Sequence, residues 1–305
     1  MPELPDIALY LHALRPRVVG RRVTNVRLAN PFLLRSIAPP LSSLQSRTIK
    51  EVGRIGKRIV FEAEGDLFLV FHLMIAGRFR WRESGDRIPA KVGLFALDFE
   101  HGTLMLTEAG TKRQASLHVV AGRDALSGHN PGGLEILEAD LPAFERALRQ
   151  DNHTLKRALT DPHLFSGIGN AYSDEILHAA RLSPFKQTSS LSDGEVQRLF
   201  EATRVTLRRW ISRLQDLAGD DFPEKVTAFH EEMAVHGKYG KPCPDCGSPV
   251  QRVVYAANEA NYCANCQTGG RLLADRALSR LLREDWPRSL DELERRRGPS
   301  AETRP

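Results

Sequence analysis

The sequence predicts an α+β protein with a strand-rich N-terminal part and a helical C-terminal part that ends in a cysteine-bearing hairpin. Short apolar runs separated by turn residues fill residues 18–120, which is the pattern of a β-sandwich or a β-barrel. Apolar residues at helical spacing then recur between residues 140 and 217. The four cysteines all lie between residues 243 and 266, in two closely spaced pairs.

Composition narrows the class of protein. A chain of 305 residues predicts two domains with a small appended module, at about 100–200 residues per domain. Hydrophobic residues at 41% and charged residues at 27% exclude a fibrous or wholly disordered chain. The longest apolar stretch, residues 67–77, is shorter than the roughly 18 residues of a membrane span. The start, MPELPD, is no signal peptide, and a net charge of +5 permits nucleic-acid binding without requiring it.

The N-terminal part begins with a helix and continues as hairpins. Pro5 suits a first helical turn, and apolar residues follow at helical spacing until Pro16, which we expect to end the helix. Two pairs of strands flank short turns, which is typical of β-hairpins. These strands are residues 59–61 with 67–71, and residues 94–99 with 103–107.

A change of pattern marks the second part of the chain. Residues 122–133 are rich in Gly, Pro and Ser and predict a linker. Asp140 then caps a helix whose apolar face continues through Leu148, Leu155 and Leu159. The predicted parts are a sandwich domain (1–121), a linker (122–139), a helical domain (140–236), a zinc-finger segment (237–288) and a disordered tail (289–305).

The cysteines form two C-x2-C pairs separated by 16 residues. Four thiolates at this spacing surround one tetrahedral Zn²⁺ and leave no open position, so the sequence predicts one structural zinc. Residues 251–255 alternate as a strand does, and a return strand would lead to Tyr262. Two disulfides or a redox site are the alternatives, but a cytosolic chain without a βαβ pattern disfavours both. The expected ligands are Cys243, Cys246, Cys263 and Cys266.

A glycine turn at residues 167–170 separates two predicted helices. Backbone N–H groups at the start of a helix, together with the helix dipole, form a site for phosphate. The same residues also fit an ordinary loop and cap, so the motif alone leaves both interpretations open. Lys156 and Arg157 on the preceding helix favour the phosphate site.

The N-terminal residues predict a nucleophilic amine. Removal of Met1 would leave Pro2 as a secondary amine, and an α-amino group has a pKa of about 7.7–8.0 against about 10.4 for Lys. Attack of such an amine on an aldehyde carbon gives a charged iminium, which withdraws electrons strongly. Glu3 is next to it and could transfer the proton. Because Pro follows Met in many proteins without such chemistry, these residues alone do not decide the point.

Five segments occur in an order that is typical of one family. They are MPELPD, RIGKRIVFE around Lys57, HLMIAGRFR from His72, GIGNAYSDEIL from Gly167, and the two C-x2-C pairs. The sequence therefore resembles the formamidopyrimidine-DNA glycosylase / endonuclease VIII (Fpg/Nei) family over roughly residues 1–285. The resemblance implies a β-sandwich with an N-terminal helix, followed by a helical domain that contains a helix–two-turn–helix and a β-hairpin zinc finger.

The same resemblance implies a bifunctional DNA repair enzyme. Such enzymes flip an oxidised or ring-opened base out of the duplex and excise it. Pro2 would form the Schiff base with the deoxyribose, Glu3 would act as acid and base, and β/δ-elimination would nick the strand. Lys57 would be the third catalytic residue, which contacts the lesion phosphate and assists the chemistry. The residues expected on other DNA phosphates are Lys156, Gly169 and Asn170.

The sequence departs from the family pattern mainly at positions that are expected to recognise the base. Asp6, grouped with the DNA-binding residues, is a shorter acid than the usual Glu. Ile75, beside Met74, stands where a Met fills the space of the flipped base. Arg113 is expected to reach the orphan base, and Asn258 replaces a phosphate-clamping arginine. We therefore expect retained chemistry with an open base preference.

The expected partner is double-stranded DNA that contains damaged bases or abasic sites. A non-catalytic lesion-binding protein derived from this fold is the alternative, and a zinc-ribbon transcription or translation factor is a third. The Pro2–Glu3 pair distinguishes them, because a pure binder does not need it. We expect a monomer with no membrane partner, in a bacterial-type cytoplasm and associated with the nucleoid.

Overall fold

The computed structural model describes residues 1–305 except 111, 256–257, 275–286 and 298–305. The chain divides into two compact units. The first comprises Met1–Gly133 and Leu207–Ala228, and the second comprises Leu134–Thr206 and Phe229–Pro305. The long helix α6 (Asp193–Ala218) thus contributes to both, whereas the sequence analysis assigned all of residues 140–236 to one domain.

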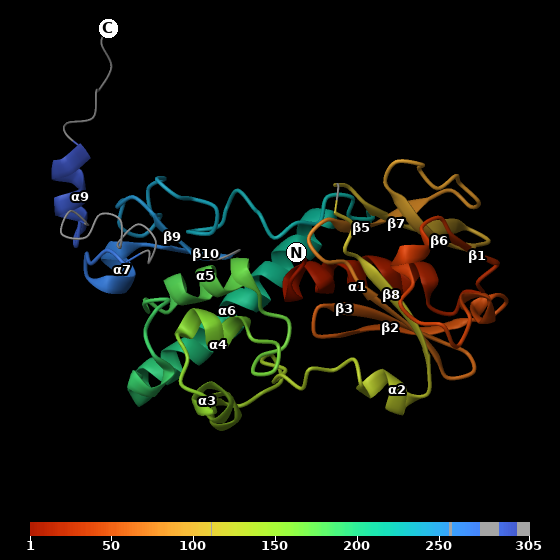
Figure 1. The fold of residues 1–305 in the computed structure, drawn as a ribbon, viewed down its shortest axis with the longest axis horizontal. Helices are drawn as coiled ribbons and strands as arrows, with labels where there is room; N and C mark the ends of the chain where they lie inside the picture. Colours follow the sequence, from red (N-terminus) through yellow and green to blue (C-terminus); the bar gives the residue numbers. More distant parts are fainter. Residues whose placement is uncertain (111, 256–257, 275–286, 298–305) are drawn as a thin grey trace, which may run out of the picture. The chain divides into compact units, whose positions relative to one another are not determined.

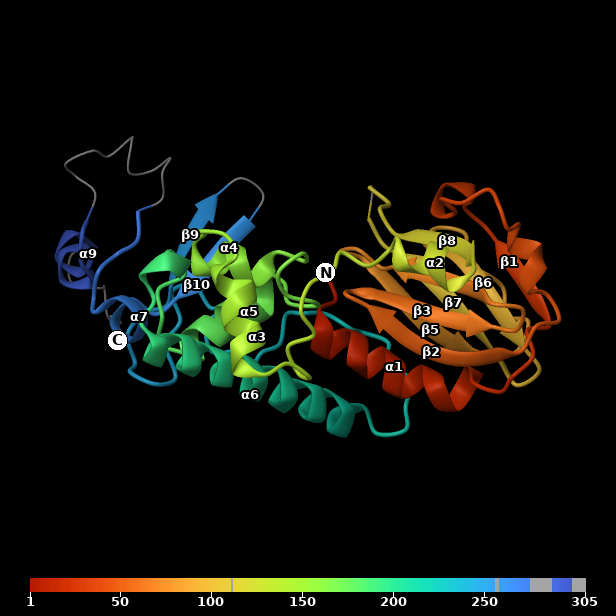
Figure 2. The same cartoon turned by 90° about the horizontal axis from the view of Figure 1, so that it is seen from below.

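The first unit is a β-sandwich accompanied by helix α1 (Leu4–Val18), as Figures 1 and 2 show. Each sheet has four antiparallel strands, in the orders β2-β3-β4-β8 and β1-β6-β7-β5. The strands are β1 (Asn25–Leu28), β2 (Ile49–Ile55), β3 (Arg58–Ala63), β4 (Leu67–His72), β5 (Gly77–Arg82), β6 (Gly93–Phe99), β7 (Gly102–Glu108) and β8 (Ser116–Ala121). Both predicted hairpins are present, as β3–β4 and β6–β7.

Aromatic side chains fill the core of the sandwich. Phe61, Phe71 and Phe79 are fully buried, and their rings meet edge to face at centroid distances of 5.1–6.3 Å. Tyr10 of α1 joins them, because its ring packs against Phe79 and its hydroxyl accepts the Phe79 N–H. This packing fixes α1, and with it the N-terminus, against the sandwich (Figure 2).

Three local predictions need correction. Helix α1 runs past Pro16 to Val18, because a proline near the end of a helix removes only one backbone hydrogen bond and Val18 is buried. The predicted linker holds a short helix, α2 (Arg123–Ser127). The face expected to run from Leu148 to Leu159 is split between two helices, and Thr154 caps the second of them.

The second unit is helical and ends in a small hairpin. Besides part of α6 it contains α3 (Leu141–Arg149), α4 (Leu155–Thr160), α5 (Asn170–Ala179), β9 (Gln251–Tyr255), β10 (Asn258–Tyr262), α7 (Ala264–Thr268) and α9 (Leu290–Arg297). Helix α9 lies in the segment 289–305 that was predicted to be a disordered tail, and residues 298–305 of that segment are outside the described residues. None of the helices in the described parts of the chain is long and apolar enough to cross a membrane.

Candidate functional site

The N-terminal residues are buried at the start of α1. Pro2 is buried, and Glu3 is the N-cap residue of the helix with 3% of its surface exposed. Glu3 and Asp6 form a capping box: the Glu3 side chain accepts the Asp6 N–H, and Asp6 Oδ2 accepts the Glu3 N–H at 2.8 Å. These two hydrogen bonds hold the backbone next to Pro2 in one conformation.

Asp6 therefore differs from its predicted role. The sequence analysis grouped it with the DNA-binding residues, but its side chain is 0% exposed and is engaged with the backbone of Glu3. A carboxylate buried in this way cannot reach a ligand without breaking the start of the helix. Asp6 is a positioning residue for Glu3.

Lys57 lies at the tip of the β2–β3 hairpin. Ile55 pairs with Arg58, which leaves only Gly56 and Lys57 in the turn. Gly56 has φ of 57°, and glycine at the first central position is typical of such two-residue turns. Burial lowers the pKa of the Lys57 ammonium, and the Glu3 carboxylate raises it in part, so the two side chains interact.

The terminal amine belongs to the same electrostatic group. Burial lowers the pKa of the Met1 amine, with opposing effects of Glu3 and Asp6 on one side and of Arg78 and Lys57 on the other. A lowered pKa leaves more of an amine unprotonated, which is the form that attacks carbon. The N-terminus, Glu3 and Lys57 thus interact electrostatically with one another, and their catalytic roles stay a prediction.

Met74 and Ile75 occupy the turn between β4 and β5. Ile75 is 65% exposed, which is unusual for a large apolar side chain, and Met74 beside it has φ of 52°. Gly77 closes this turn, since a Cβ there would lie 2.2 Å from the Leu73 carbonyl oxygen. The turn therefore presents Ile75 as an apolar tip on a fixed base.

Arg113 lies on the exposed loop before β8. Its guanidinium donates to the carbonyl of Lys91. Glu108, which is buried at the end of β7, accepts the N–H groups of Gln114 and Ala115 at 2.9–3.3 Å and anchors the loop. Arg113 is exposed, and its contact with the orphan base stays a prediction.

His72 and Arg58 were not selected from the sequence. Arg58 follows Lys57 at the start of β3, and His72, at the end of β4, is its register partner. Burial, together with the Arg58 and Lys57 cations, lowers the pKa of His72 to about 4, so the imidazole is neutral at pH 7. The signal that could have identified them is a histidine and two cations at the same end of a predicted hairpin.

Asn170 is the first residue of α5, and Gly169 is its N-cap. Asn170 is half-buried and Gly169 is buried, so the turn presents the start of a helix as predicted. Lys156 is different: it is 1% exposed, and its Nζ donates to Asn170 O at 2.6 Å and to Asp174 Oδ1 at 2.5 Å. This corrects the prediction that Lys156 contacts phosphate, because its buried ammonium instead holds the turn through the Asn170 carbonyl and the Asp174 carboxylate.

Two neighbouring acids on α5 extend this arrangement. Asp174 Oδ2 accepts from His236 Nδ1 at 2.8 Å and from Asn261 Nδ2 at 3.1 Å. Glu175 accepts three backbone N–H groups of residues 234–236 at 2.8–3.0 Å. Together they tie the turn at Gly169 to the hairpin strand β10. Neither acid was among the predicted site residues, although an acidic pair inside an apolar helix indicates buried polar contacts.

The four cysteines gather within the second unit. Their sulfur atoms lie within 4.8 Å of one another, with 3.9 Å between Cys243 and Cys266 and 3.4 Å between Cys246 and Cys263. Zn–S bonds of about 2.3 Å in a tetrahedron place sulfurs about 3.8 Å apart, so the residues fit Zn²⁺. His178 Nε2 is 3.3 Å from Cys243 Sγ, so the imidazole is placed to hydrogen-bond a ligand sulfur without being one of the four ligands. Asn258 begins β10, and its side chain lies outside the described residues.

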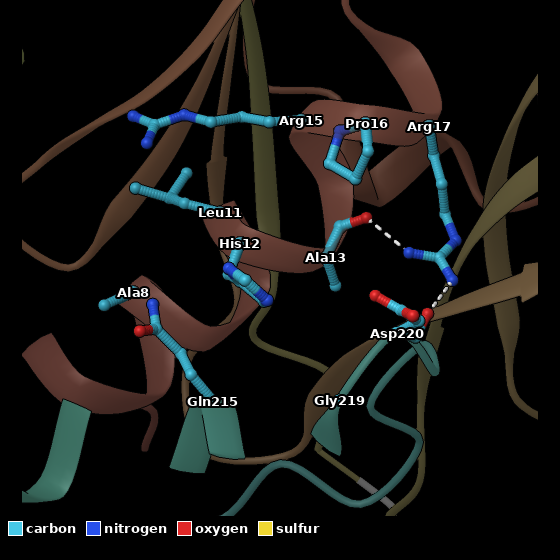
Figure 3. A pocket seen from close by; sticks show the side chains of 10 residues that line it. All are labelled: Ala8, Leu11, His12, Ala13, Arg15, Pro16, Arg17, Gln215, Gly219 and Asp220. Carbon is cyan, nitrogen blue, oxygen red and sulfur yellow. Dashed lines mark hydrogen bonds between the residues drawn. The ribbon is translucent and has the colours of Figure 1, made fainter. Parts of the chain in front are cut away.

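A cavity of about 420 Å³ lies between α1 and the end of α6, within the first unit (Figure 3). Its walls include His12 of α1 and Gln215 of α6, and Arg17 spans one side by bonding Ala13 O and Asp220 O. None of the predicted catalytic residues lines it. This cavity is therefore separate from the Pro2 group.

Comparisons with known proteins agree along most of the chain. Residues 1–115 match the family model of the formamidopyrimidine-DNA glycosylase N-terminal domain, residues 133–218 that of its H2TH domain, and residues 240–269 a zinc finger found in FPG and IleRS.

Curated relatives and solved structures give the same result. The formamidopyrimidine-DNA glycosylase of Thermus thermophilus is 34% identical over 280 residues, covering 88% of this chain and 100% of the relative. That of Heliobacterium modesticaldum is 31% identical with the same coverage. Lactococcus lactis Fpg bound to abasic-site DNA has a TM-score of 0.78 at 24% identity, covering 87% of this chain and 99% of that one. The same enzyme with oxidised-pyrimidine DNA has a TM-score of 0.77 at 25% identity, covering 88% and 100%.

Proposed function

Because the chain belongs to the formamidopyrimidine-DNA glycosylase family, it is a DNA glycosylase of base-excision repair, and we propose that it is also a lyase that nicks the DNA strand through Pro2. The observation that carries the proposal is the group formed by the buried N-terminus, Glu3 and Lys57. Burial favours the neutral form of the Met1 amine. Pro2, which would carry the amine after removal of Met1, is buried next to it, and the Glu3 carboxylate and the Lys57 ammonium belong to the same group. These are a nucleophile, a proton-transfer group and a phosphate-binding cation.

The chemistry follows from these three groups. The Pro2 amine attacks C1′ of the flipped nucleotide, and the base leaves with the electrons of the glycosidic bond and a proton delivered by way of Glu3. Protonation of O4′ then breaks the C1′–O4′ bond of the sugar ring, and the nitrogen lone pair completes the iminium, which acidifies the C2′ hydrogen. Its loss to a base breaks the C3′–O bond, and the 3′ phosphate leaves. Lys57 holds a backbone phosphate while this proceeds.

Substrate recognition uses the remaining exposed residues. Relatives are named for formamidopyrimidine, and a similar structure holds an oxidised pyrimidine, so we propose oxidised and ring-opened bases as substrates. Ile75 fills the space that the flipped base leaves, Arg113 contacts the orphan base, and the turn at Gly169 and Asn170 binds a phosphate. This chain has Asn258 where the family pattern has an arginine, so the position brings no charge to a phosphate, and we expect δ-elimination to be weaker than β-elimination.

The remaining partners follow from the same proposal. One structural Zn²⁺ is held by the four cysteines and stabilises the hairpin. The protein acts as a monomer on double-stranded DNA in the bacterial cytoplasm, at the nucleoid where that substrate lies. The alternative of a non-catalytic lesion binder is not favoured, because binding alone does not require a buried amine beside Glu3.

Borohydride trapping on a duplex with one abasic site tests the lyase. We expect a covalent complex with the Met-free, zinc-loaded protein, and at least a hundredfold less with Pro2→Gly, since the glycine amine lacks the ring that preorganises the nucleophile (roughly two orders of magnitude for a misplaced group). Glu3→Gln is the companion variant and should still bind the duplex. If the wild-type protein binds this DNA but forms no adduct, the lyase proposal is wrong.

A further inference from the structure

A cluster of basic side chains outside the catalytic group lies on one face of the β2-β3-β4-β8 sheet. It consists of Arg58, His118 and His129, and we call it the Arg58 cluster. In the strand register Arg58 pairs with His72, and His118 pairs with Val70. Residues two positions apart on a strand point to the same face, so Arg58, His72 and His118 share a face of the sheet. His129 comes from the segment after α2, and its ring centroid is 4.8 Å from that of His118.

The cluster is held together by direct contacts. Arg58 Nη1 donates to the carbonyl oxygen of His129 at 3.0 Å, and the two imidazole rings meet at 61°. All three side chains are half-buried, so each still has surface toward solvent. That carbonyl bond uses one of the five N–H donors of the guanidinium, and several remain for a ligand.

The cluster carries positive charge without a matching carboxylate. Burial and the Arg58 cation lower the pKa of both imidazoles, and Arg35 also lowers that of His118. Among the residues that the structure describes, no acid forms an ion pair with Arg58. Further along β3 a cation does have a carboxylate partner, because Arg123 pairs with Glu62 at 3.0 Å. A half-buried guanidinium whose charge no carboxylate compensates favours an anion.

We propose that the Arg58 cluster binds a phosphodiester of the damaged strand next to the one that Lys57 holds. The inference rests on the proposed function, and it adds a second phosphate site to it. Lys57, His72 and the Arg58 cluster form one continuous track, because Lys57 precedes Arg58 and acts electrostatically on His72. Successive phosphates of one strand present charges at a short spacing that such a track can follow.

The chemistry of the cluster selects phosphate over a metal ion. Two adjacent imidazoles could ligate a divalent cation, but the guanidinium and Arg35 beside them repel it. An arginine fork and imidazole N–H groups match the oxygens of a phosphodiester. A bound phosphate would also offset the Arg58 charge, which adds to burial in lowering the imidazole pKa values.

The test is the salt dependence of binding to a duplex with an uncleavable abasic-site analogue. Arg58→Gln should weaken binding by about tenfold and reduce the slope of log K against log salt by about one, as for the loss of one phosphate contact. Arg123→Gln is the matched control, since its charge is already compensated by Glu62, and it should leave the slope unchanged. Urea unfolding should show Arg58→Gln as stable as the wild type, because the substitution leaves no acid unpaired.

Neutral methylphosphonates, placed at one phosphate at a time, locate the contact. The wild type should lose affinity at the phosphate adjacent to the Lys57 position, and Arg58→Gln should lose nothing more there. Titration with inorganic phosphate alone, followed through the imidazole signals, distinguishes a general anion site from a DNA site. An unchanged slope for Arg58→Gln, or methylphosphonate losses equal to those of the wild type, would overturn the proposal. Borohydride trapping by the wild type tests the lyase independently, so a covalent adduct together with an unchanged slope would overturn the second phosphate site alone.

Discussion

Lys57 and Lys156 were both predicted to contact a DNA phosphate, Lys57 as a catalytic residue as well, and their environments in the structure are opposite. Lys57 stands at a hairpin tip in the first unit and makes no hydrogen bond or ion pair with any residue that the structure describes. Lys156 lies inside the second unit, where Asp174 Oδ1 and the Asn170 carbonyl use its donors. A half-buried cation that makes no hydrogen bond or ion pair is available to a ligand, and one that is fully paired is part of the scaffold.

The two environments extend beyond the lysines. Around Lys57 lie Arg58 and neutral His72 as well as the Glu3 carboxylate, so cations outnumber the acid there. Around Lys156 the neighbours are Asp174, His236 and Asn261, which satisfy one another. The first region is arranged for an anion from outside, and the second holds the helix turn and the zinc hairpin in place.

Zinc removal should have the largest effect and should separate the two regions. Metal binding contributes on the order of 10 kcal/mol to small modules of this kind, so chelation should unfold β9 and β10 and expose the Asp174 group. Amide hydrogen exchange before and after chelation measures this. Faster exchange in the second unit with unchanged protection of β3 and β4 is expected. Equal loss in both would contradict the separation.

Removing each lysine in turn sharpens the comparison. Lys156→Met leaves Asp174 buried without its cation and should lower the free energy of unfolding by about 3–5 kcal/mol. Lys57→Met should leave that free energy unchanged or raise it, while weakening DNA binding. Lys186→Met is the control, because its pair with Glu195 is partly exposed and is worth at most about 1 kcal/mol. Urea titrations of the three variants decide the point, and a Lys156→Met variant as stable as the wild type would refute the buried-pair role.

The pH dependence of Lys57 should be the smallest effect. Its pKa is lowered by folding, so the unfolded chain binds more protons in the window between the lowered value and the ordinary 10.5. The stability of the wild type relative to Lys57→Met should therefore rise as the pH rises through this window. DNA affinity should fall over the same window as Lys57 loses its charge. Paired unfolding curves across alkaline pH measure the first change, and a relative stability that falls with pH would show that Lys57 has a partner.

Local patterns were sufficient for much of the fold. The hairpins around residues 64–66 and 100–102, the cap at Asp140 and the strand at residues 251–255 depend on neighbours in sequence, and the structure has each of them. The cysteine spacing likewise predicted the cluster of sulfurs. The end of α1 was wrong, because the cost of Pro16 is small beside the burial of the residues around it.

The sequence by itself determined which chemistry the chain carries: an N-terminal Pro–Glu, a hairpin lysine, a glycine turn before a helix and four thiolates. Only the tertiary structure decided which charges face outward. Asp6 and Lys156 are buried, and Arg58, His118 and His129 meet from three separate segments. The reason is physical: a charged side chain is buried only where a distant residue supplies a partner, and that partner is chosen by packing, not by spacing along the chain.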